Sequence, residues 1–120
     1  MNTPTPIVAL VADLIFRSRI TAEARAAGVE LAVIGQPAKL ATTDGGALIV
    51  DLNLNGAIAA AAQWAVATGN PVIGFVSHVD EQTIAEARAA GIQNVVARSR
   101  FVQVLPLWLE SQRAKPQKNG

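Results

Sequence analysis

The chain contains no cysteine and only one histidine, His78. Without cysteine it can form no disulfide framework, no thiolate metal site and no cysteine nucleophile. This is compatible with a cytoplasmic protein, and that is the location we expect. His78 has no second histidine or cysteine with which to bind a metal, so we interpret it as a surface residue.

A long apolar run and a strong net charge are missing as well. The run that follows "MNTPTP", from Ile7 to Ala12, is too short for a signal peptide, and no stretch reaches the ~18 apolar residues of a membrane span. The net charge of +1 gives no overall field that would attract nucleic acid. We therefore expect neither a membrane nor a nucleic acid as a partner.

Apolar residues, in contrast, are abundant. The chain has 120 residues, of which 51% are hydrophobic, and this is enough for one compact domain with a sizeable core. Its last residues, "ESQRAKPQKNG", are polar and basic. We expect a single domain over residues 6–112 and a flexible basic tail over residues 113–120.

Strand patterns and helix patterns alternate along the chain. Predicted strands cover residues 7–12, 29–35, 47–52, 70–77 and 92–98, and predicted helices cover 14–28, 56–69, 79–91 and 99–114. The segment 36–46 is a short helix or a loop. Gly28 and Gly69 are expected to close helices, and Asp80 and Ser99 to cap helix starts. This alternation predicts an α/β fold, a doubly wound five-stranded parallel sheet with the flavodoxin-like order 2-1-3-4-5 in three α/β/α layers.

Polar residues stand where four of these strands end. In an open α/β sheet the ligand site lies beyond the carboxyl ends of the strands, at the switch between the first and third strands. The residues at these ends are Asp13, Asp51, Ser77 and Arg98. Two neighbouring carboxylates repel each other unless a cation lies between them, and Mg²⁺ prefers oxygen ligands of this kind. A phosphoryl group on Asp51 would be contacted by the hydroxyl of Ser77 and the charge of Arg98.

Three segments resemble the receiver domain of bacterial response regulators, with the resemblance spanning residues 6–112. They are "LVADLIFRSRI", "LIVDLNLNG" and "VIGFVSHVDEQTIAEARAAGIQNVVARSRF". The resemblance implies that Asp51 is the phosphoacceptor, that Asp13 and the carbonyl of Asn53 complete a Mg²⁺ site with it, and that Ser77 and Arg98 contact the phosphate. It also implies two-component or phosphorelay signalling, with a histidine kinase or an output protein as partner and no enzymatic activity.

The sequence also departs from the receiver pattern. Ala12 takes the place of the first acidic residue, Arg98 that of the usual lysine and Ser99 that of the following proline. The loop after Asp51 is short and lacks the usual Met-Pro pair. Losing a carboxylate weakens a metal site, and a planar guanidinium differs in shape from a compact ammonium. We therefore predict a divergent receiver or pseudo-receiver, and the sequence leaves open whether Asp51 still accepts a phosphoryl group or is degenerate.

The residues themselves leave simpler roles open. Asp13 could cap the helix that follows it, and Asp51 could be a solvated strand end. Arg98 could pair directly with Asp51, which would put a salt bridge where the metal would lie. Arg17 and Arg19 could attract phosphate or form a solvated basic face.

Two predicted helices suggest contact surfaces. The helix 56–69 has no charged residue on any face, and Trp64 among its alanines suggests that a second face is covered. The helix 99–114 carries apolar residues over about half of its helical wheel, more than docking on one sheet needs. We expect a homodimer through this helix. The alternative is that both helices are buried in a small domain.

Two other functions remain open: a small-ligand-binding or enzymatic flavodoxin-like domain, and a scaffold domain without a ligand. Against an enzyme, the chain has no glycine-rich phosphate loop such as GxGxxG or GxxxxGK, and few pairs of a nucleophile with a base. We favour a stand-alone signalling domain that acts through protein contacts.

Overall fold

The structure, a computed structural model, describes residues 5–77 and 80–114. His78 and residues 115–120 of the expected tail lie outside the described residues, so the interpretations given for them stay predictions.

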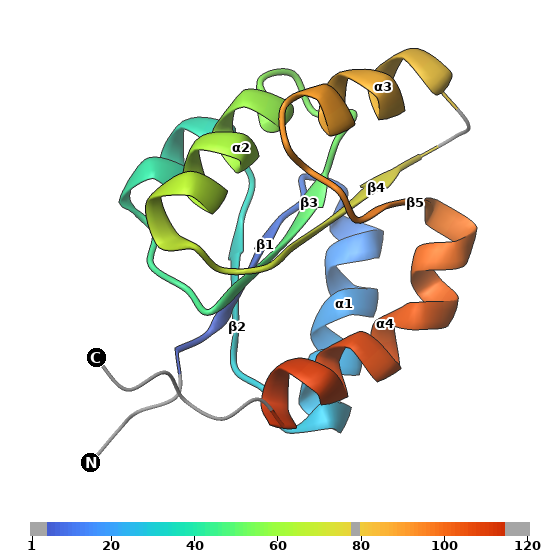
Figure 1. Cartoon of the computed structure of the whole chain (residues 1–120). Helices are drawn as coiled ribbons and strands as arrows, with labels where there is room; N and C mark the ends of the chain where they lie inside the picture. Colours follow the sequence, from blue (N-terminus) through green and yellow to red (C-terminus); the bar gives the residue numbers. More distant parts are fainter. Residues whose placement is uncertain (1–4, 78–79, 115–120) are drawn as a thin grey trace.

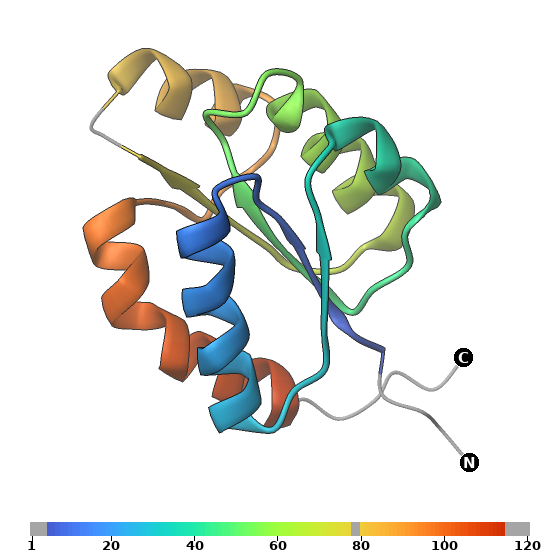
Figure 2. The ribbon, with the colours of Figure 1, turned by 180° about the vertical axis from the view of Figure 1, so that it is seen from behind.

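The described residues form one parallel sheet in the order β2-β1-β3-β4-β5 (Figure 1). Its strands are β1 (Ile7–Leu10), β2 (Leu31–Ile34), β3 (Ala47–Asp51), β4 (Val72–Val76) and β5 (Val95–Ala97). The helices α1 (Leu14–Ala27) and α4 (Arg98–Ala114) cover one face, and α2 (Ala57–Thr68) and α3 (Glu81–Ala89) cover the other (Figure 1, Figure 2). The predicted three-layer fold with strand order 2-1-3-4-5 is confirmed.

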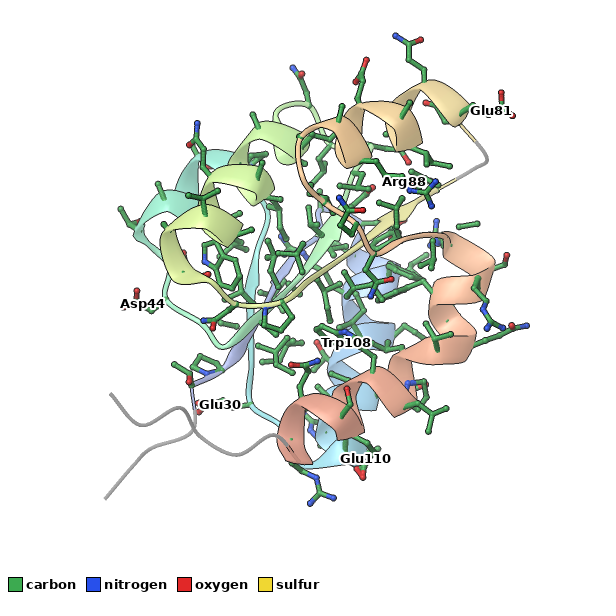
Figure 3. The ribbon with its side chains drawn as sticks, in the orientation of Figure 1. Glu30, Asp44, Glu81, Arg88, Trp108 and Glu110 are labelled. Atoms are coloured by element: carbon green, nitrogen blue, oxygen red, sulfur yellow. The ribbon has the colours of Figure 1, made fainter. Side chains whose placement is uncertain are left out.

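Helices on both faces explain why the central strands are continuous apolar runs. Successive side chains of a strand point to opposite faces, so Ile7, Ala9 and Val11 pack with the core of α1 and α4, while Val8 and Leu10 pack with that of α2 and α3. Figure 3 shows apolar side chains filling the space between the layers, with charged residues such as Glu81 and Glu110 at the periphery.

Three phenylalanines form the centre of the core under α1 and α4. The ring centroids of Phe16 and Phe75 lie 4.9 Å apart, and those of Phe75 and Phe101 lie 4.8 Å apart. Phe16 also contacts Phe101 at 5.8 Å. Aromatic pairs at these separations contribute beyond the area they bury, so this cluster joins α1, β4 and α4.

The expected helix ends at Gly28, Gly69 and Asp80 are confirmed, with Gly69 closing α2 at a φ of +69°, and Asp13 caps α1 as the sequence left open. The carboxylate of Asp13 accepts hydrogen bonds from two backbone N–H groups in the first turn of α1. Gly28 closes α1 with a φ of +73°, a backbone conformation that favours glycine. Asp80 caps α3 by accepting from the backbone N–H of Thr83 at 3.2 Å.

Near the last strand, two sequence boundaries were wrong. Ser99 does not precede the final helix, because α4 begins at Arg98 directly after β5 and places Ser99 in its first turn. The last strand was predicted from Ile92 but begins at Val95. Ile92 is buried, yet its N–H donates to the carbonyl of Ala87 at 2.9 Å and so completes the end of α3.

The uncertain segment 36–46 contains a 3₁₀ helix, η1 (Pro37–Thr42), that lies against α2. The indole Nε1 of Trp64 donates to the carbonyl of Thr43 at 3.1 Å, which ties the end of this segment to α2. A second face of the charge-free helix is therefore partly covered by the chain itself, as its composition suggested.

The apolar stripe of α4 is largely used inside the domain. Phe101, Leu105 and Leu109 are buried, and Trp108 is half-buried against the same core. Pro106 lies inside the helix, where it cannot donate a backbone hydrogen bond, and the helix axis changes direction along its length (Figure 1, Figure 2). Among the described residues, no helix is both long enough and apolar enough to cross a membrane.

Candidate functional site

The carboxyl ends of β1, β3, β4 and β5 meet at one edge of the sheet, as parallel strands require. Asp13 follows β1, Asp51 is the last residue of β3, Ser77 follows β4 and Arg98 follows β5. The structure brings these residues together in two linked pairs, Asp13 with Arg98 and Asn53 with Ser77, with Asp51 interacting with both.

Asp13 has two structural partners. Its Oδ1 accepts hydrogen bonds from the backbone N–H groups of Ile15 at 2.9 Å and Phe16 at 3.0 Å. Its Oδ2 lies 3.8 Å from an η nitrogen of Arg98. The side chain therefore caps α1 with one oxygen and faces a guanidinium with the other, which fits the simpler role that the sequence left open for it.

The guanidinium of Arg98 lies over the aromatic ring of Phe16. Its central carbon lies 4.2 Å from the centroid of the Phe16 ring, within the range of a cation–π interaction. The ion pair with Asp13 is partly exposed, with 37% of the Arg98 side chain and 46% of the Asp13 side chain accessible, so it contributes little stability by itself. The ring and the carboxylate both lie on the side of Arg98 that faces α1.

Asp51 is in a different environment. Burial raises the pKa of its carboxyl above the ordinary value of 3.8, because it penalises the charged form. The backbone N–H of Asn53, which donates to Oδ1 at 3.0 Å, and the charge of Arg98 both lower this pKa, while the charge of Asp13 raises it. Asp51 is therefore half-buried and coupled to both neighbours, and it is not a fully solvated strand end.

Asn53 connects the ends of β3 and β4. Its side-chain oxygen accepts a hydrogen bond from the backbone N–H of Ser77 at 2.6 Å, while its own N–H binds Asp51. Asn53 and Ser77 are exposed. The predicted site residues thus share one edge of the sheet, with Asn53 holding the backbone of Ser77 beside Asp51.

One alternative from the sequence needs correction. Arg98 was considered as a direct partner of Asp51, but its ion pair is with Asp13. The reason is the position of α1, which places Phe16 under Arg98 and puts the carboxylate of Asp13 in front of it. Its influence on Asp51 is only that of a nearby charge.

No family model matches the sequence, and no curated protein matches it. Solved structures do match in fold. The phosphorylated cyanobacterial phytochrome response regulator RcpA has a TM-score of 0.79 at 12% identity, over 96% of this chain and 98% of that chain. A response regulator from Thermotoga maritima has a TM-score of 0.75 at 10% identity, over 94% and 100%. A putative pilus assembly-related protein from Burkholderia pseudomallei has a TM-score of 0.69 at 16% identity, over 95% and 92%.

The chain has the fold of a response-regulator receiver domain. The resemblance seen in three sequence segments is therefore confirmed for the fold. At identities this low, similarity establishes the fold alone, and the chemistry of the edge has to be argued from its own residues.

The side chains at this edge supply fewer ligands than the Mg²⁺ site that a receiver implies, and the predicted set of Asp13, Asp51 and the carbonyl of Asn53 stays a prediction. Among residues 5–77 and 80–114 no group of three or more acidic or histidine side chains could hold a metal ion. The position before Asp13 is Ala12, which has no ligand atom in its side chain, and the guanidinium of Arg98 already faces Asp13. A divalent cation would need the two remaining carboxylates while lying next to a fixed positive charge.

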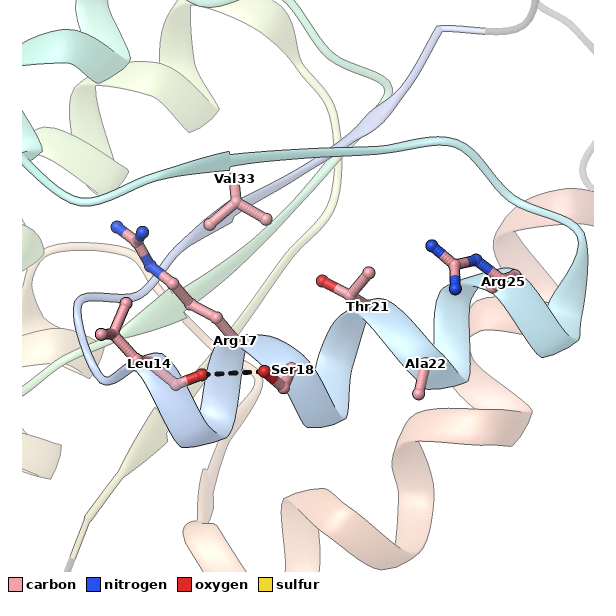
Figure 4. Close-up of a pocket in the computed structure, with 7 residues that line it drawn as sticks. All are labelled: Leu14, Arg17, Ser18, Thr21, Ala22, Arg25 and Val33. Atoms are coloured by element: carbon pink, nitrogen blue, oxygen red, sulfur yellow. Dashed lines mark hydrogen bonds between the residues drawn. The ribbon is translucent and has the colours of Figure 1, made fainter.

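Two arginines of α1 have local roles, and Figure 4 shows one of them, Arg17, extending from α1 beside Val33 of β2. The Nε of Arg17 donates to the carbonyl of Val11 at 2.5 Å, and its guanidinium lies beside Gly35, where a larger residue would require the arginine side chain to move. Arg17 therefore stabilises the loop after β1 and lies next to the end of β2. Arg19 lies 3.9 Å from Glu23 on the same helix. Neither contact is with Asp51.

Sequence reasoning missed two features of this edge. Phe16 has the type and helical spacing of a core residue, and only the packing of α1 beside α4 shows that its ring also contacts Arg98. Leu14 and Ile15 look like core residues by type, but they are 72% and 82% exposed in the first turn of α1. A helical wheel anchored on Phe16 and Ile20 would have placed both outside the buried face.

Proposed function

We propose that this chain is a receiver-like signalling domain that acts by binding other proteins, and that Asp51 is not an efficient phosphoacceptor. One observation carries the proposal. Asp13, the carboxylate that would share a metal with Asp51, is engaged by the N-terminus of α1 and by Arg98.

The chemistry of phosphoryl transfer explains why this matters. Transfer to a carboxylate brings together groups of like charge, and bound cations normally neutralise that charge. In this chain the neutralising charge comes from Arg98, which is already paired with Asp13 and stacked on Phe16. A phosphoryl group at Asp51 would have to compete with Asp13 for the same guanidinium.

Protein contact as the mode of action is supported by the surface beside the site. Leu14 and Ile15 expose apolar side chains in the turn that follows Asp13, and adjacent exposed apolar residues are suited to a partner protein. The fold also occurs in a putative pilus assembly-related protein, so similarity in fold is compatible with roles outside phosphotransfer. The partner would be an output protein or a histidine kinase, and we propose no enzymatic activity.

Homodimerisation through α4 stays a prediction from the sequence. Most of the apolar residues of this helix pack within the chain, but Leu107 is 76% exposed beside Pro106. Light scattering during gel filtration, compared between the protein and Leu107→Glu, measures the oligomeric state. A dimer that the substitution dissociates would support the prediction, and a monomer in both cases would remove it.

Beryllofluoride, a phosphoryl mimic, tests the proposal directly. We would titrate it with Mg²⁺ into labelled protein and follow the backbone amides, with Asp51→Asn as the control. The expected result is no saturable shift at Asp51, Asn53 or Ser77. Saturable, Mg²⁺-dependent shifts that Asp51→Asn abolishes would show a working phosphorylation switch and contradict the proposal. Ultraviolet–visible absorbance of the same sample tests the flavin-binding alternative.

A further inference from the structure

Arg98 places a positive charge at the N-terminus of α4, where the helix itself disfavours a cation. It is the first residue of α4, and that helix has no acidic residue in its first turn. A cation at a helix N-terminus is unfavourable, because the helix dipole is positive there. The position of Arg98 is therefore stabilised by something other than α4, and the contacts that the structure gives it are with Phe16 and Asp13.

The backbone around Arg98 leaves little freedom. The preceding residue, Ala97, is paired in the sheet with Val76 of β4, and the helix starts immediately afterwards. The backbone of Arg98 is therefore held at the edge of the sheet. From there the guanidinium extends over the buried ring of Phe16 and reaches Oδ2 of Asp13 at 3.8 Å.

The carboxylate oxygens of Asp13 and Asp51 that could bind a cation are partly occupied by backbone N–H groups. Oδ1 of Asp13 accepts two backbone N–H groups, and Oδ1 of Asp51 accepts one. A metal ion shared by the two carboxylates would therefore rely on Oδ2 of Asp13, the atom that faces Arg98. The ion and the guanidinium would then lie next to the same oxygen, and their positive charges would repel each other.

We propose that Arg98 is the resident cation of the site: it neutralises the carboxylate pair Asp13 and Asp51 and thereby bars divalent metal ions from it. The inference concerns cation binding alone and does not rest on the proposed signalling function. A site with only two carboxylates is weak for a metal, but it becomes available once the fixed charge is gone.

The test is a Mn²⁺ titration of the free protein, in which paramagnetic broadening of the amide signals reports where the ion binds. The variant Arg98→Gln removes the charge and keeps most of the stem. Arg100→Gln is the matched control, because it removes the same charge from an exposed residue in the same helical turn, whose side chain hydrogen-bonds to Gln103. A dispersed amide spectrum of each variant shows that it is folded.

We expect Arg98→Gln to bind Mn²⁺ at least ten times more tightly than the wild type or Arg100→Gln, with broadening centred on Ala12, Asp13 and Asp51. Adding Asp51→Asn to Arg98→Gln should remove this binding. Equal affinity in the wild type and Arg98→Gln, whether both bind or neither does, would overturn the proposal. So would an equal gain in Arg100→Gln, because it would show a general effect of charge. No phosphoryl donor or partner is present, so the result is independent of the signalling proposal.

Discussion

The two faces of the sheet are built differently. Under α1 and α4 the core contains Phe16, Phe75 and Phe101 in mutual contact. Under α2 and α3 it consists of aliphatic residues and alanines with one aromatic residue, Trp64. In α3 the buried residue is Ala87, and Ile84 packs partly buried against the same core.

This difference determines how each face connects to the site. The aromatic face continues to the edge of the sheet, because Phe16 lies in the core and also supports Arg98. The other face reaches the edge through the loop after β3, where Asn53 holds the backbone of Ser77. Changes on the aromatic face should therefore alter both stability and the charges at the site, whereas changes on the aliphatic face away from the loop after β3 should alter stability alone.

The largest expected effect is on the aromatic face. Phe101→Ala removes a buried ring that contacts both other phenylalanines, and it should lower the free energy of unfolding by about 3–5 kcal/mol. Urea denaturation measures this loss. Val66→Ala on α2, where the side chain is 87% exposed, is the control and should change stability by less than about 0.5 kcal/mol. Similar losses in the free energy of unfolding for both variants would show that the phenylalanine cluster does not stabilise the aromatic face as argued.

A smaller loss is expected on the aliphatic face. Trp64→Phe keeps a ring in the core but removes the hydrogen bond to the carbonyl of Thr43, which should cost about 1–2 kcal/mol. Hydrogen exchange should show faster opening of η1, with the amides around Asp13 and Arg98 unchanged. If the exchange of those amides increases as much as that of η1, the aliphatic face is coupled to the site at Asp13 and Arg98, and the two faces are not independent.

Asp13 allows its two roles to be separated. Asp13→Ala removes the helix cap and should cost about 1 kcal/mol, whereas Asp13→Asn keeps an acceptor for the cap and should cost only a few tenths. Thermal unfolding of both variants at low and high salt measures the difference. Equal losses would mean that the charge facing Arg98, not the cap, carries the contribution of Asp13.

The smallest effect depends on pH. Because the pKa of Asp51 is raised in the folded chain, the folded state binds more protons than the unfolded state between pH 3.8 and that raised pKa. Stability therefore falls as the pH rises through this window, and the cost is complete above it. Asp51→Asn keeps an acceptor for the N–H of Asn53, so it should be more stable than the wild type at pH 7 and lose this advantage below pH 3.8. A wild type that gains stability relative to the variant as the pH rises would contradict the burial argument.

The sequence was sufficient for the fold because its signals are local. Strand and helix patterns alternate, Gly28 ends α1 where a left-handed residue is needed, and Asp13 and Asp80 stand where capping residues stand. The location of the candidate site could also be predicted, because parallel strands present their carboxyl ends at the same edge of the sheet.

The details of the site were not available from the sequence, because they depend on packing between distant elements. Whether Arg98 turns to Asp13 or Asp51 is decided by the position of Phe16 on α1, which lies far from Arg98 along the chain. Ile92 has the composition of a strand residue, but its N–H is used to end α3. The width of the apolar stripe on α4 likewise gave no indication of how much of it the core would bury.

The proposal that Asp51 is not an efficient phosphoacceptor is tested most directly with acetyl phosphate and Mg²⁺, with intact mass as the readout. The wild type is compared with the double variant Ala12→Asp and Arg98→Lys, which restores the receiver pattern and supplies a further carboxylate that offsets the charge kept at position 98, and with Asp51→Asn in each background. We expect no added phosphoryl group on the wild type and an Asp51-dependent addition on the double variant. Addition to the wild type that Asp51→Asn abolishes would show a working phosphoacceptor and contradict the account.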